Sequence, residues 1–99
     1  ISLVWRSYFK MELIEINKME NPKAEIKLKF ADIEKNYKFS YSDGEIFTVD
    51  FPEELRKILR LLPVSITHSL VDKIENFLIS DIINFPFEME IEKEILQMV

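Results

Sequence analysis

His68 and Asp72 come closest, by residue type and spacing, to a catalytic pair. His68 is the only histidine of the chain and lies four residues before Asp72, so a helix would place imidazole and carboxylate side by side. A nucleophilic triad also needs a serine at a strained turn and an oxyanion hole, and the chain has only one glycine for such a turn. We therefore expect a surface pair near a helix start and assign no catalytic residue. A small enzyme using His68 with Asp72 is the second alternative for function.

A second set of reactive groups is the row of carboxylates at Glu88, Glu90 and Glu92. Hard divalent cations prefer such ligands, but side chains at alternate strand positions lie about 7 Å apart and point in parallel. They would not converge on one ion without further ligands, so we expect no metal and no other cofactor. The row is instead expected to form a solvated strand face that lies beside Lys27 and Lys29 of a neighbouring strand.

Aromatic residues interleaved with lysines are typical of proteins that bind single-stranded nucleic acids. A weak form of this pattern is given by Tyr8, Lys10, Lys27, Lys29 and Lys38. The net charge is −5, however, whereas binding to a phosphate backbone usually requires a basic patch. Nucleic-acid binding through the outer face of a sheet is therefore the first alternative for function, and most rings are expected in the core.

Length and composition indicate one globular domain over residues 1–99. Hydrophobic residues make up 47% of the chain and charged residues 31%, which is a globular composition. The longest apolar run is interrupted by Asp81 and Pro86, well short of the ~20 residues that span a bilayer. The chain has no cysteine and therefore no disulfide, so we expect a reducing compartment, the cytoplasm by default.

Alternation of apolar and charged residues predicts strands in the first half of the chain. Ile26, Leu28 and Phe30 alternate with charged residues, and this strand should pair with the next one, around Tyr37. Residues 3–16 also favour a strand, with a bend near residues 6–7, because a continuous one would reach about 45 Å. Residues 1–10 alternatively fit a short helix folded over the sheet, which would give a monomer.

The stretch around Asp43 and Gly44 predicts a β-hairpin. A two-residue turn would place Phe47 and the preceding tyrosines on opposite faces, whereas a three-residue loop over residues 42–44 brings the large apolar groups to one side. That loop pairs Phe39 with Phe47 and needs Gly44 in the left-handed region.

After the hairpin the apolar period changes from two to about 3.6 residues. One helix is expected after Asp50, which would form a capping box with Glu53, and it should end before Pro63. A second helix should run from about residue 65 or 67 to about residue 83, burying Leu70, Ile74, Phe77 and Leu78. A last strand then has Phe85, Phe87, Met89 and Ile91 facing inwards. The predicted fold is α+β: a mainly antiparallel sheet of about four to five strands with two helices on one face, in the order β-β-β-β-α-α-β.

We expect a non-enzymatic protein-interaction module that self-associates or serves as a small subunit, inhibitor or immunity-type partner of a larger protein. The first expected partner is a second copy of the chain, because a long apolar N-terminal strand would leave a free edge over residues 1–13. No membrane and no small-molecule substrate is expected. The expected partner-binding residues are Trp5, Phe9, Met11, Glu88, Glu90 and Glu92.

Overall fold

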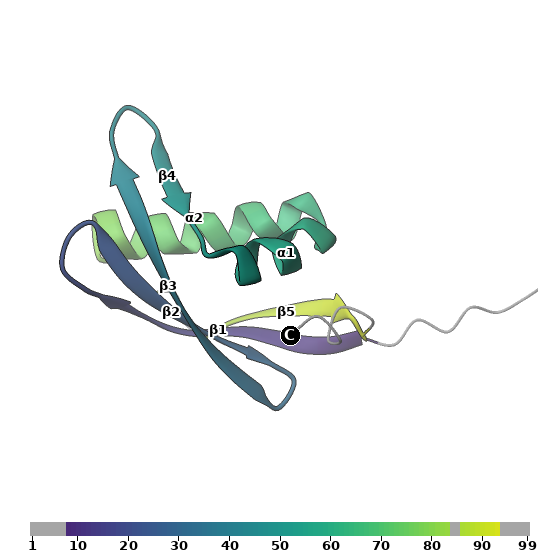
Figure 1. The fold of residues 1–99 in the computed structure, drawn as a ribbon. Coiled ribbons are helices and arrows are strands. Elements are labelled where there is room, and N and C mark those ends of the chain that lie inside the picture. The colour runs from purple at the N-terminus through teal and green to yellow at the C-terminus, as the bar shows by residue number, and fades with distance from the viewer. Residues whose placement is uncertain (1–7, 84–85, 94–99) are drawn as a thin grey trace, which may run out of the picture.

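The computed structural model describes residues 8–83 and 86–93, which form a curled antiparallel sheet with two helices on one side (Figure 1). The strands are β1 (Tyr8–Lys18), β2 (Lys23–Phe30), β3 (Ile33–Asp43), β4 (Phe47–Asp50) and β5 (Phe87–Glu92), and the helices are α1 (Glu53–Leu61) and α2 (Val64–Ser80). Their order along the chain is β-β-β-β-α-α-β, and the predicted fold class is confirmed.

β1 is an interior strand, paired with β2 on one side and β5 on the other. Phe9, Met11 and Leu13 are buried at odd positions, as the alternation predicts. The register with β2 then shifts between Leu13 and Glu15, and Ile16 is buried at an even position. A bulge changes which side of the strand faces the core, so the bend within β1 lies at residues 13–15.

β5 lies beside β1, so the prediction that the last strand neighbours Lys27 and Lys29 is wrong. The sheet order is β4-β3-β2-β1-β5, which places β1 between the glutamate row and these lysines. Consecutive hairpins pair β1 with β2 and β2 with β3, and β5 pairs along the remaining side of β1. Glu88 instead lies 3.6 Å from the Lys10 ammonium, and Lys27 pairs with Glu15 at 3.2 Å.

The hairpin between β3 and β4 has a three-residue loop, as predicted, but its register is shifted by four residues. Tyr41 was expected to pair with Glu45. Tyr41 pairs with Val49, and Asp43 with Phe47, which leaves residues 44–46 in the loop. Both registers place the rings on one face, because they differ by an even number of residues. The observed one also buries Phe51, whose ring centroid lies 5.4 Å from that of Phe39.

Gly44 has no special backbone role in this loop. Its φ is not positive, and a Cβ atom built on it would meet nothing within 4 Å. The prediction of a left-handed glycine is therefore wrong, because the loop begins at Gly44 instead of ending there.

The helices follow the predicted apolar stripes, but their ends differ from the prediction. Pro52 is the N-cap of α1 without a side-chain cap, so the expected capping box of Asp50 and Glu53 does not form. Helix α2 starts directly after Pro63 and ends at Asp81, which has a φ of 56° in the left-handed region.

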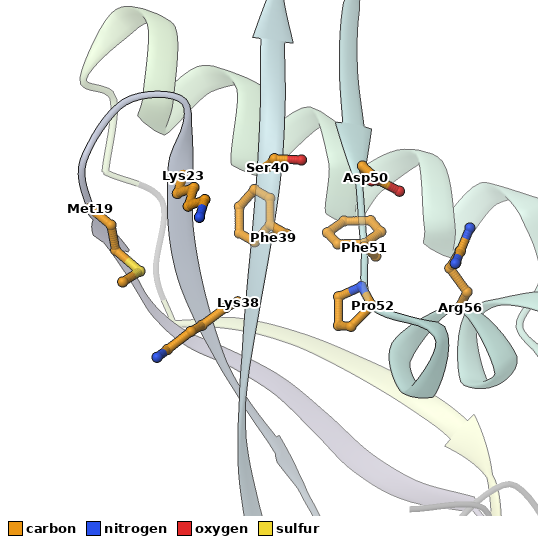
Figure 2. A pocket seen from close by; sticks show the side chains of 9 residues that line it. All are labelled: Met19, Lys23, Lys38, Phe39, Ser40, Asp50, Phe51, Pro52 and Arg56. Carbon is orange, nitrogen blue, oxygen red and sulfur yellow. The ribbon is translucent and has the colours of Figure 1, made fainter.

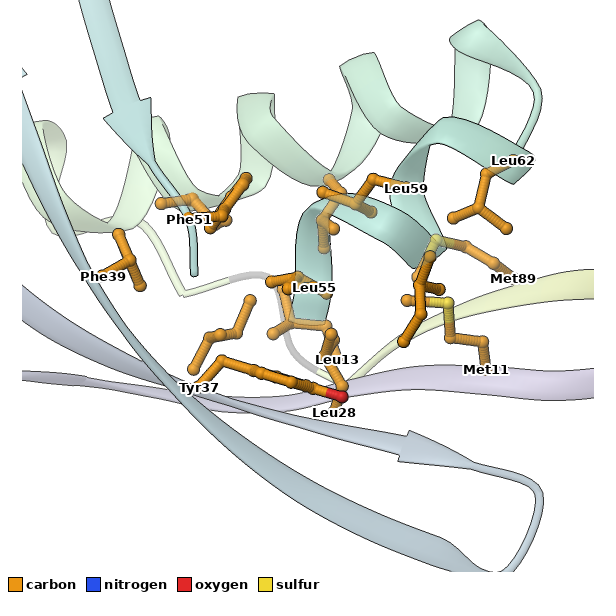
Figure 3. Close-up of a cluster of buried hydrophobic side chains, with 14 of the residues drawn as sticks. Met11, Leu13, Leu28, Tyr37, Phe39, Phe51, Leu55, Leu59, Leu62 and Met89 are labelled. Carbon is orange, nitrogen blue, oxygen red and sulfur yellow. The ribbon is translucent and has the colours of Figure 1, made fainter. Parts of the chain in front are cut away.

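One hydrophobic core lies between the helices and the inner face of the sheet (Figure 3). Helix α1 contributes Leu55, Ile58 and Leu59, and helix α2 contributes Leu70, Ile74 and Leu78, while Phe77 is only half-buried. Met89 and Ile91 of β5 are buried as predicted, and Phe85 lies outside the described residues. Among the described residues, no helix is long and apolar enough to cross a membrane.

Candidate functional site

His68 and Asp72 lie on the exposed side of α2. With Ser69, Val71 and Glu75 they line a shallow, open depression. No hydrogen bond or ion pair joins the imidazole to the carboxylate in the part of the chain that the structure describes. The arrangement is that of a surface pair.

The glutamate row lies on the outer face of the sheet, opposite the helices. Glu88 and Glu90 are exposed, Glu92 is half-buried, and the three carboxylates follow one strand instead of converging. Within residues 8–83 and 86–93, no cluster of three or more potential ligands could hold a metal ion.

The described part of β1 is only partly an edge. Phe9 is 7% exposed and Met11 is fully buried. The strand is paired on both sides from Met11 to Leu13, and from Tyr8 to Lys10 it pairs with β5 alone. These two side chains therefore belong to the core. Pairing of a second copy through residues 1–13 stays a prediction, because residues 1–7 lie outside the described residues. Trp5 lies outside the described residues.

On the outer face of β1, β2 and β3, carboxylates and lysines alternate from strand to strand, whereas Glu12 of β1 is paired with Glu88 of β5. One cross-strand row contains Glu12, Lys29 and Glu34, from β1, β2 and β3. The next row contains Glu15, Lys27 and Asn36, and a third contains Asn17, Glu25 and Lys38. Because carboxylates separate the lysines, this face is not the basic stripe that a phosphate backbone favours.

β3 has an edge that β4 covers only in part. β3 contains 11 residues and β4 contains four, and their pairing is confined to residues 40–43 of β3. Within the described residues, no strand pairs with residues 33–39 on this side. Every second residue of such an edge directs its N–H and C=O groups away from the sheet, where another strand can bind them.

A groove of about 480 Å³ lies at this edge, where the chain leaves β4 and turns into α1 (Figure 2). Its buried floor contains the rings of Phe39 and Phe51, and Met19 and Pro52 supply further apolar surface. The polar lining residues are Lys23, Lys38, Ser40, Asp50 and Arg56. The groove therefore combines an aromatic floor with a charged rim.

Two of the rim cations are available to a ligand. Arg56 is engaged by Glu53 at 3.2 Å, but in the described part of the chain the ammonium groups of Lys23 and Lys38 have no ion-pair partner. Lys38 belongs to the uncovered stretch of β3, so the free edge and the groove meet at this residue.

Helix α1 approaches the inner side of the same edge. Burial raises the pKa of the Tyr37 phenol above its ordinary value of 10.0, and the nearby Glu54 carboxylate raises it further. Tyr37 therefore remains neutral in the folded protein over the physiological pH range.

Sequence reasoning located the strand around Tyr37 but not its free edge. The strand begins at Ile33, but residues 34–36 are all polar and exposed, so no alternation in the sequence extends the strand that far. The short partner strand, cut off by Phe51 and Pro52, is what uncovers the edge. Comparisons with family models, with curated proteins and with solved structures find no match to this chain, so its function must be inferred from this geometry.

Proposed function

We propose that this chain is a non-enzymatic protein-interaction module that binds an extended segment of another chain along the free edge of β3. The partner is a second copy or a larger protein to which this chain is a small subunit, inhibitor or immunity-type partner. The observation that carries the proposal is the mismatch between the 11 residues of β3 and the four of β4.

Strand addition at a sheet edge gains its affinity from main-chain hydrogen bonds and its specificity from pockets for alternate side chains. The edge provides the first requirement, and the groove over Phe39 and Phe51 provides the second. Long uncovered edges are a liability for aggregation, and proteins usually protect them with charge or by covering them. Glu34 and Lys38 are exposed along this edge, which makes pairing depend on the charges of the partner.

Site-specific photo-crosslinking in the native host tests this function. A photoreactive phenylalanine analogue replaces Lys38 at the edge in one variant and Glu45 in the hairpin loop in a matched control. Both positions are exposed, so neither replacement should disturb the core. We expect a discrete crosslinked species from position 38 and none from position 45. No species above the control at position 38 would refute interaction through this edge.

A further inference from the structure

We propose that the free edge of β3 binds the same edge of a second copy, around a two-fold axis that passes through Asn36. This inference rests on the proposed function and names its partner. Antiparallel pairing about Asn36 places Glu34 opposite Lys38 of the second copy and Lys35 opposite Tyr37 of the second copy. The two five-stranded sheets then join into one, with both pairs of helices on the same side.

The charges of the outer face favour this register. In the rows across β1, β2 and β3, carboxylates and lysines alternate, and at the free edge one row ends with Glu34 and another with Lys38. The axis through Asn36 places Glu34 opposite Lys38 of the second copy. Because the interface is isologous, the same pair forms twice. Opposite charges at directly paired positions stabilise antiparallel strands, while like charges destabilise them.

Neighbouring registers lack this complementarity. If the inner faces of both sheets are to lie on the same side, the two-fold axis must pass through a residue and not between two residues. An axis through Lys35 would place the two copies of that lysine opposite each other. An axis through Tyr37 would pair Glu34 with Ser40, which is already paired with Asp50 of β4. Only the axis at Asn36 pairs Glu34 with Lys38 in both directions.

The groove accepts the end of the second strand. Ile33 is 41% exposed, and it lies on the inner side of β3, the same side as Lys35 and Tyr37. In the register centred on Asn36, Ile33 of the second copy lies opposite Phe39, a floor residue of the groove. Pairing over residues 34–38 stops short of Ser40, where β4 begins. The exposed isoleucine thus reaches the apolar floor, and removing it from water contributes to association.

Reciprocal charge reversal tests the register in purified protein by light scattering coupled to size exclusion. Glu34→Lys and Lys38→Glu should each weaken dimerisation at least about tenfold, since each replaces two attractive pairs with two repulsive ones. The double variant retains the net charge of −5 and should restore the dimer. Glu45→Lys in the hairpin loop carries the same charge change as Glu34→Lys and should have no effect. Circular dichroism confirms that each variant is folded.

Disulfide trapping tests the axis directly. The chain has no cysteine, so Asn36→Cys introduces a single thiol. Directly opposed residues of antiparallel strands have Cα atoms about 4.5–5.5 Å apart, which is within the range of a disulfide. Mild oxidation should convert this variant to a covalent dimer, whereas Glu45→Cys should remain monomeric under the same conditions.

A monomeric mass at all concentrations, or a dimer insensitive to both charge reversals, would overturn the proposal, as would the absence of trapping at position 36. If position 38 crosslinks to a different protein in the host, the second copy is the wrong partner while the proposed function stands. If position 38 crosslinks to nothing, both fail.

Discussion

Phe51→Ala should be among the most destabilising substitutions near this edge, because the Phe51 side chain is buried and forms part of the floor of the groove. Its side chain is 7% exposed, and its ring centroid lies 5.4 Å from that of Phe39. Truncating a buried phenylalanine usually costs about 3–5 kcal/mol. For a domain of this size that corresponds to a fall of roughly 12–40 °C in the melting temperature. Removal of the Phe51 ring would also widen the groove, because it would expose Phe39.

Phe47→Ala is the informative comparison. The register expected from the sequence pairs Phe47 with Phe39, but in the structure Phe47 pairs with Asp43 and is only half-buried. Its truncation should therefore cost less, about 1–2 kcal/mol, since less apolar surface is exposed. Ile46→Ala, 77% exposed in the loop, should change stability by less than about 0.5 kcal/mol. Urea unfolding followed by circular dichroism measures all three, and a larger loss for Phe47→Ala than for Phe51→Ala would refute the observed register.

Three further predictions concern local conformation and pH. Gly44→Ala should leave the free energy of unfolding unchanged or raise it by up to about 1 kcal/mol in urea unfolding. The reason is that φ is not positive and the added Cβ meets nothing, while the unfolded chain loses entropy. A loss of more than about 1 kcal/mol would contradict the loop conformation. Asp81→Gly and Asp81→Ala both remove the 2.6 Å ion pair with Lys18, so they differ only at the backbone, where φ is 56° and glycine has no Cβ penalty. Asp81→Gly should therefore melt at a higher temperature than Asp81→Ala, and an equal or lower melting temperature would contradict the left-handed C-cap. The raised pKa of Tyr37 means that the folded state binds more protons than the unfolded state above pH 10, so stability from this residue is present below pH 10 and lost as pH rises through the folded pKa. Tyr37→Phe should reduce the decline in stability above pH 10, and an unchanged decline would contradict the raised pKa.

The order of the elements was predictable because each one carries its own period. Ile26, Leu28 and Phe30 alternate cleanly with charges, and the stripe of Leu70, Ile74 and Leu78 follows helical spacing. These patterns depend only on which side of an element faces the core, and that side is the same whichever neighbours the element has.

The neighbours of each strand were not predictable from the same patterns. Alternation determines the face of a strand but leaves an even register shift free, and the hairpin register was wrong for this reason. Alternation also does not specify which strands are neighbours, and the neighbour of β5 was wrong for that second reason. The bulge between Leu13 and Glu15 is marked in the sequence only by the adjacent pair Leu13 and Ile14, where the apolar residues move from odd to even positions.

The candidate site depends on these long-range features. The free edge exists because β4 is only four residues long and ends at Asp50, and the groove exists because Phe51 and Pro52 turn towards α1 at that point. Among the residues expected to bind a partner, Phe9 and Met11 were chosen for being large and apolar, and that property is the one that buries them.

Amide hydrogen exchange along β3 tests the central claim, pairing of another chain with its free edge, most directly. In dilute protein, the N–H groups of residues 34–38 that point away from β2 should exchange rapidly, because no strand within the described residues binds them. At concentrations where the second copy binds, the same amides should become protected, while those of residues 44–46 in the hairpin loop should not change. Pairing at the free edge would be contradicted if the exchange of residues 34–38 does not depend on concentration in the purified chain. The exchange would also have to stay unchanged with any partner crosslinked at position 38.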